Sequence, residues 1–141
     1  MDDRLKDMLN QSVSREMGVS IQYMWQHVMA VGLSSPELKE VFKQIAVTEM
    51  KHAEAFAERL YYLGGTPTVK PTDIKYGGDL KKMVHDDLET ESYAIRLYTE
   101  AIRLCEEVDD PVTRLLYEKV LSQEQGHWHT FSILLSEQKT G

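Results

Sequence analysis

Several features are scarce or missing in this sequence, and each absence narrows the class of protein. Cys105 is the only cysteine among 141 residues, so an internal disulfide is impossible, which fits a reducing cytoplasm. We expect Cys105 to be a small, buried or half-buried apolar residue. No stretch approaches the roughly 18 apolar residues that span a bilayer, and the charged start MDDRLKD carries no secretory signal. We therefore expect a cytoplasmic protein without a membrane partner.

Positive charge is also scarce. The 16 lysines and arginines are outnumbered by 23 acidic residues, which gives a net charge of -7. Without a basic tail or stripe, a nucleic-acid partner is not expected. The length of 141 residues and the 42% of hydrophobic residues are ordinary for one globular domain, which we expect to span residues 1–141.

Apolar periodicity predicts four helices and no strand. Pro36 after Ser35 predicts a helix start with Ser35 as its N-cap, and Pro111 predicts another start. Prolines and glycines between residues 64 and 78 predict a long loop, which implies a crossover between two antiparallel helix pairs. The predicted fold is an all-α, antiparallel four-helix bundle with one long crossover between the second and third helices. The predicted helices cover residues 3 to about 31, 36 to about 63, about 79 to 107 and 111 to about 137.

Two four-residue segments, Glu-Met-Lys-His and Glu-Gln-Gly-His, each place a carboxylate and an imidazole three residues apart. In a helix such residues share one face and can reach a single metal ion. A lone glutamate precedes each segment by 33 residues, so the second set repeats the first after 75 residues. The candidate metal ligands and catalytic residues are Glu16, Glu49, His52, Glu91, Glu124 and His127.

All of these residues interrupt apolar stripes that we expect to face the core. The inner face of the last predicted helix, for example, holds Leu115, Val120, Leu121, Glu124, His127, Phe131 and Leu134. Four buried carboxylates would repel one another unless cations were bound between them. Two divalent ions balance their charge, and oxygen and imidazole ligands suit iron or manganese, with zinc as an alternative. A single Glu-x-x-His usually lies on a solvated face, but two copies with matching glutamates predict a dinuclear site.

Other polar residues accompany the repeat. Tyr23 follows Glu16 by seven residues, and Tyr98 follows Glu91 by seven. They either hydrogen-bond the glutamates, donate an electron, or are core aromatics with a satisfied hydroxyl. Tyr23 is accordingly a further candidate catalytic residue. Asp87, one turn before Glu91, is a candidate acceptor for the free N–H of a ligand histidine.

The chain resembles ferritin-like proteins, and bacterioferritin most of all, over nearly its whole length. The segments that carry the resemblance are Glu16 with Gln22-Tyr23, Glu49-Met50-Lys51-His52-Ala53-Glu54, Leu63-Gly64-Gly65-Thr66-Pro67, Asp87-Leu88 before Glu91, and Glu124-Gln125-Gly126-His127. The resemblance implies a homo-oligomer, at least a two-fold dimer, with two Fe(II) ions oxidised by O2 or H2O2. It further implies that Glu16, Glu49 and His52 bind one ion, that Glu91, Glu124 and His127 bind the other, and that Glu49 and Glu124 bridge.

The resemblance also implies a second cofactor, haem b, bound by Met50 at a dimer interface; the alternative is an interface or packing methionine. Ser20 and Lys43 are polar where a porphyrin needs apolar neighbours. Bacterioferritin continues into a fifth helix, whereas this sequence ends at Gly141, so we expect a short form. Gln44 and Thr48 replace the family's additional iron ligands, which weakens a storage role more than a catalytic one.

The leading hypothesis is a cytoplasmic ferroxidase that oxidises Fe(II), with iron storage or detoxification as a further step. Tyr23 and Tyr98 fit a rubrerythrin-like di-iron oxidase or peroxidase that stores no iron. That family's additional glutamate is absent, because Ala94 occupies its place. A third reading is a non-enzymatic bundle that carries metal or haem.

Overall fold

A computed structural model describes residues 2–140, with side chains up to residue 136. Its helices are α1 (Asp3–Met29), α2 (Ser35–Tyr62), α3 (Leu80–Glu107) and α4 (Pro111–Thr140). Within residues 2–140 there is no β-strand. None of the helices in this range is both long and apolar enough to cross a membrane. The predicted all-α architecture is confirmed.

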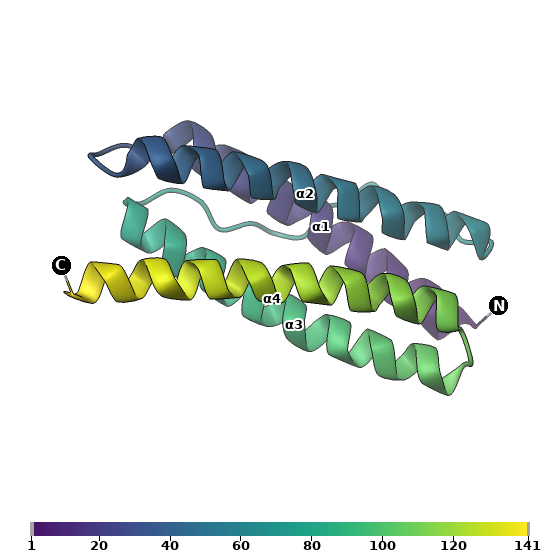
Figure 1. The fold of residues 1–141 in the computed structure, drawn as a ribbon. Helices are drawn as coiled ribbons and strands as arrows, with labels where there is room; N and C mark the ends of the chain where they lie inside the picture. Colours follow the sequence, from purple (N-terminus) through teal and green to yellow (C-terminus); the bar gives the residue numbers. More distant parts are fainter. Residues whose placement is uncertain (1, 141) are drawn as a thin grey trace.

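The helices form two antiparallel pairs, α1 with α2 and α3 with α4 (Figure 1). The crossover, residues 63–79, runs along the bundle from the end of α2 to the start of α3, which confirms the predicted long connection (Figure 1). As a result, each of the four helices contributes one face to a common interior.

The crossover is fixed to α1 at close range. The Thr72 amide donates to the Ser14 carbonyl over 3.1 Å, and the Lys75 amide donates to the Gln22 side chain over 3.1 Å. A Cβ atom on Gly18 would lie 2.4 Å from the Thr72 hydroxyl oxygen and 2.8 Å from its carbonyl oxygen. Glycine is therefore required at this point of α1, because any side chain would displace the crossover.

Helices α2 and α4 begin at or next to the prolines, as predicted, but the cap residue of α2 differs from the predicted one. Asp110 accepts a hydrogen bond from the Thr113 amide over 3.0 Å directly before Pro111, as a helix cap does. For α2 the predicted N-cap was wrong: Ser34 is the cap, and Ser35 is already helical. Proline is tolerated anywhere in the first turn, since N–H groups there have no helical partner, so Pro36 does not fix the cap.

Two apolar clusters fill the bundle on either side of a polar layer. One contains Leu9, Phe56 and Tyr98, and the other contains Tyr23 and Phe42. Along every helix the candidate ligands fall between the residues of the two clusters. The polar layer therefore lies in the middle of the bundle core, between the two apolar clusters.

Some predictions about the core were wrong. Leu115 is 52% exposed, because α4 turns Tyr117 inwards and Leu115 lies two residues away, near the opposite side of the helix. Tyr117 is fully buried, and its hydroxyl lies 2.8 Å from that of Ser12. The first helix also ends earlier than the predicted residue 31: α1 stops at Met29, and Val31 is exposed. Cys105 is buried as predicted, and burial raises its pKa to about 11.

Candidate metal centre

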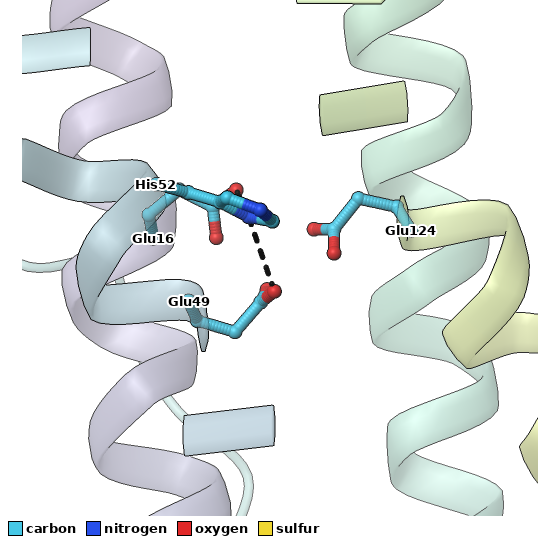
Figure 2. Close-up of side chains that lie close together, drawn as sticks. All are labelled: Glu16, Glu49, His52 and Glu124. Carbon is cyan, nitrogen blue, oxygen red and sulfur yellow. Dashed lines mark ion pairs between the residues drawn. The ribbon is translucent and has the colours of Figure 1, made fainter. Parts of the chain in front are cut away.

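The four helices bring all six candidate ligands into the polar layer. Glu16 comes from α1, Glu49 and His52 from α2, Glu91 from α3, and Glu124 and His127 from α4. The four glutamates are fully buried, and His52 is nearly so. Figure 2 shows the Glu124 carboxylate facing the side chains from α1 and α2 across the bundle. Residues that are 75 positions apart in the sequence thus meet in one place.

The donor atoms form two overlapping groups, within each of which they lie at most 4.8 Å from one another. Glu49 and Glu124 belong to both groups. Two neighbouring ions that share a pair of carboxylates require this arrangement. The members of the groups are Glu16, Glu49, His52 and Glu124 for the first, and Glu49, Glu91, Glu124 and His127 for the second.

The donor set fits metal ions, because several buried donor atoms have no hydrogen-bond partner. These atoms are His52 Nδ1, His127 Nδ1, Glu49 Oε1, Glu91 Oε2 and Glu124 Oε1. Buried polar groups are normally paired, so a set of unpaired nitrogen and oxygen atoms aimed at a common space indicates a cation site. The absence of a thiolate among them favours iron or manganese over softer metals.

A hydrogen bond orients one imidazole. The Nε2 atom of His52 contacts the Oε1 atom of Gln123. Because an amide oxygen only accepts, Nε2 carries a proton and Nδ1 is turned towards Glu16 and Glu49, 3.3 Å from each. Gln123 is not predicted from the sequence, where its only signal is its position next to Glu124.

The crowded carboxylates influence one another's protonation. Burial, followed by repulsion from Glu124, raises the pKa of Glu49 well above its usual range. Burial acts in the same direction on Glu124, but the Arg15 and His127 side chains outweigh it and lower the pKa of Glu124. Burial opposes the charge on His127, yet the adjacent Glu124 and Glu91 raise its pKa to about 9. Protons and Arg15 thus offset the negative charge when no metal is present.

Arg15 is the main residue that sequence reasoning missed. It is 2% exposed, and its Nη1 atom contacts Glu124 and lies 3.0 Å from Glu16 Oε2 and 2.8 Å from Glu49 Oε2. Its Nη2 atom lies 3.5 Å from Glu91 Oε2. One guanidinium therefore touches carboxylates from all four helices. The available signal was a long basic residue directly beside Glu16, between the small residues Ser14 and Gly18.

Both tyrosines of the repeat are fully buried and bind glutamates. Tyr23 donates to Glu91 Oε1 over 2.5 Å, and Tyr98 donates to Glu16 Oε1 over 3.0 Å. Each tyrosine therefore binds the lone glutamate of the other half of the repeat. Burial raises the pKa of both phenols well above the usual range, so both hydroxyls keep their protons as donors.

Asp87 is buried near the site but has a different partner from the one expected. Its Oδ1 atom accepts a hydrogen bond from Gln22 Nε2 over 3.0 Å, and the same nitrogen also bonds the Thr90 hydroxyl. Since the Gln22 oxygen receives the Lys75 amide, this chain connects Asp87 to the crossover rather than to a histidine. The expected bond from a ligand histidine is not among the contacts of the described side chains.

Met50 lies outside the metal centre. It is 47% exposed on α2 and lines an outer cavity of about 660 Å³ with Met17, Met24 and Val47. Ser20 also lines this cavity, and its hydroxyl donates to the Ala46 carbonyl over 2.7 Å. The Ser20 hydroxyl is therefore hydrogen-bonded within the protein.

Comparisons with known proteins identify the family. The family described as Ferritin-like domain matches residues 6–140. The chain belongs to the ferritin-like family. A curated bacterioferritin from Desulfovibrio desulfuricans is 34% identical over 122 residues, which cover 86% of this chain and 68% of that protein. The resemblance to bacterioferritin predicted from the sequence is thereby confirmed.

Two solved structures in the ferritin-like family have the same fold. The Desulfovibrio desulfuricans bacterioferritin, whose di-iron site was solved in different catalytic states, has a TM-score of 0.92 at 32% identity and covers 98% of this chain and 81% of its own. A ferritin-like di-iron-carboxylate protein from Bacillus anthracis strain Ames has a TM-score of 0.91 at 25% identity, with coverage of 94% and 96%.

Proposed function

We propose that this protein is a ferroxidase that binds two Fe(II) ions between its helices and oxidises them with O2 or H2O2. The observation that carries the proposal is the pair of overlapping donor groups that share Glu49 and Glu124. Relatives described as bacterioferritin, and a related structure with a di-iron site, support the same chemistry. Manganese or a mixed pair of metals suits the same donors.

In this proposal each residue has a defined role. Glu16 and His52 would hold one ion, Glu91 and His127 would hold the other, and Glu49 and Glu124, which belong to both donor groups, would be shared between them. The two Fe(II) ions would give one electron each, and the two electrons with two protons from solvent would reduce O2 to H2O2, or H2O2 to water. The four carboxylates would stabilise the more highly charged Fe(III) product. Tyr23 and Tyr98 hold the two lone glutamates in place, a role supported by their hydrogen bonds of 2.5 and 3.0 Å.

The substitution Glu91→Ala tests the activity. It removes a carboxylate that belongs to the second group only, so we expect Fe(II)-dependent oxygen or peroxide consumption to be lost. Glu100→Ala, at an exposed position of the same helix, is the matched control and should keep the wild-type rate. An unchanged rate in Glu91→Ala would contradict the ferroxidase assignment.

We further propose that Met50 binds haem b between two copies of this chain. Support comes from the outer cavity of about 660 Å³, whose lining includes Met17, Met24 and Val47. Met50 and Val47 are exposed on this face, and Trp25 and Val28 extend the exposed apolar surface along α1, as in a homodimer interface. Haem addition should produce a Soret band in the wild-type protein but not in Met50→Ala. Absence of the band in both proteins would leave Met50 as a packing residue.

Storage of the oxidised iron, in the cytoplasm, completes the proposed role. Light scattering distinguishes this storage role from the rubrerythrin-like alternative. The hydrogen bonds from Tyr23 and Tyr98 to glutamates favour that alternative. A hollow 12- or 24-subunit particle that retains iron supports storage. A dimer that turns over without retaining iron supports the oxidase.

A further inference from the structure

We propose that Arg15 is an internal cation that competes with metal ions for the four glutamates and moves into an adjoining groove when the ions bind. This inference rests on the proposed two-metal function. It assigns to this chain a residue that sets the affinity of the centre without being a ligand.

The first step is that the guanidinium binds the same four carboxylates that the ions would use. Its Nη1 atom contacts oxygens of Glu124, Glu49 and Glu16, which are three of the four members of the first donor group. Its Nη2 atom lies 3.5 Å from Glu91, a member of the second group. The two terminal nitrogens thus lie against the same carboxylates that the two ions would use.

The second step is that guanidinium and ions exclude each other. Arginine has no lone pair for a metal, keeps its charge at every physiological pH, and cannot become a ligand. An ion bound to the Oε2 atom of Glu49 at about 2.0–2.2 Å would compete for that oxygen with Nη1, which lies 2.8 Å from it. Two divalent ions together with Arg15 would also bring five positive charges to four carboxylates.

The third step is that a groove beside the centre can accommodate the Arg15 side chain when it leaves the carboxylates. A groove of about 790 Å³ adjoins the centre between α1, the crossover and α3, and Arg15 itself lines it. The groove is also lined by Asp73, whose carboxylate can pair with a guanidinium, and by the Tyr93 ring. Arg15 is already at the boundary, since Nη2 donates to the Thr90 carbonyl over 3.3 Å and Thr90 lines the same groove.

The inward position of Arg15 is also incompletely bonded. Its Nε atom is buried and has no hydrogen-bond partner. The guanidinium therefore stays inside because of the carboxylate charges, and neutralising those charges with metal removes the reason for it to stay.

Arg15→Gln tests the competition. Without the cation, the metal-free protein should melt at a lower temperature, because four buried carboxylates lose their partner. Mn(II), measured by calorimetry, should bind at least tenfold more tightly than to the wild type. Arg15→Lys keeps the charge and should remain near the wild-type affinity. Arg96→Gln removes an exposed arginine from the same groove and should change neither value.

A second measurement needs no variant. Phenylglyoxal labelling of the wild-type protein, read by mass spectrometry, should spare Arg15 in the metal-free state and modify it once Mn(II) is bound. Arg96 is exposed and should be labelled in both states. Protection of Arg15 in both states would overturn the proposed movement.

The outcomes separate this inference from the proposed function. If wild type and Arg15→Gln both bind two Mn(II) ions with equal affinity, the competition is refuted and the two-metal site remains. Weaker binding by Arg15→Gln also refutes it, because Arg15 would then support the ligands. If neither protein binds Mn(II), the two-metal function fails, and this inference fails with it.

Discussion

The hydroxyl of Tyr23 on α1 lies 2.5 Å from Oε1 of Glu91 on α3, so a residue from one half of the repeat holds a candidate ligand of the other. Removing this hydroxyl in Tyr23→Phe deletes the hydrogen bond to Glu91 Oε1. We expect a loss of about 1–2 kcal/mol in unfolding free energy, as for other buried hydrogen bonds. Fe(II) oxidation, followed by stopped-flow absorbance, should also slow.

Tyr61→Phe is the control for this substitution, because Tyr61 is exposed on α2. It should leave both stability and rate unchanged. Tyr98→Phe removes the equivalent bond to Glu16 and should resemble Tyr23→Phe. A Tyr23→Phe protein with wild-type rate and stability would show that the tyrosine only fills space.

Metal binding should become tighter as the pH rises towards 9. The neighbouring glutamates raise the pKa of His127 to about 9, so the metal-free site holds a proton that a metal ion must displace. Calorimetry of Mn(II) binding at pH 7 in buffers of different ionisation enthalpy should therefore detect proton release. His129→Gln, at an exposed position, should not alter it. Affinity independent of pH between 6.5 and 9 would contradict this prediction.

The raised pKa of His127 also predicts how the stability of the metal-free protein depends on pH. Because the pKa of His127 in the folded protein lies above the ordinary value of 6.5, the proton stabilises the folded state fully below about pH 6.5. That contribution should decline as the pH rises through about 9. Melting temperatures of the metal-free protein across this range measure it.

Replacing Glu49 should stabilise the metal-free protein and weaken metal binding. Burial and repulsion from Glu124 raise the pKa of Glu49, so a neutral glutamine of the same shape relieves repulsion. We expect Glu49→Gln to raise the melting temperature of the metal-free protein. It should weaken Mn(II) binding at least a hundredfold. The exposed Glu54→Gln change on the same helix should do neither.

Two glycine substitutions make a matched pair for the fold. Gly18→Ala would place a Cβ atom 2.4 Å from the Thr72 hydroxyl oxygen, and we expect it to cost about 1–3 kcal/mol. In Gly126→Ala the Cβ atom meets nothing within 4 Å, so better helix propensity should add about 0.5–1 kcal/mol. Urea denaturation compares the two. Equal effects would refute the close packing of the crossover on α1.

The sequence predicts the helices and the ligand groups because both depend on spacing. Glu49 and His52 share a face at a separation of three residues, and the repeat supplies their counterparts on α4. The exact ends of helices depend on local hydrogen bonds, which is why Ser34 rather than Ser35 caps α2. The single-domain prediction and the metal-binding roles of the six residues still await experiment.

Two features could not be derived from the spacing of residues in the sequence. One is the inward position of Arg15, and the other is the hydrogen bond from each tyrosine to the lone glutamate of the other half of the repeat. A helical pattern places Arg15 beside the inward face but does not show that its long side chain turns into the carboxylates. Likewise, pairing Tyr23 with Glu91 requires the lateral distance between α1 and α3, which depends on how the helices pack. Such contacts between helices far apart in sequence become visible only in three dimensions.

Anomalous scattering at the iron edge, from crystals prepared anaerobically with Fe(II), tests the central claim most directly. Two peaks roughly 3.5–4 Å apart, one beside His52 and one beside His127 with Glu49 and Glu124 between them, are the predicted result. A map without iron among these side chains, with the Arg15 guanidinium still against the four glutamates, would contradict it.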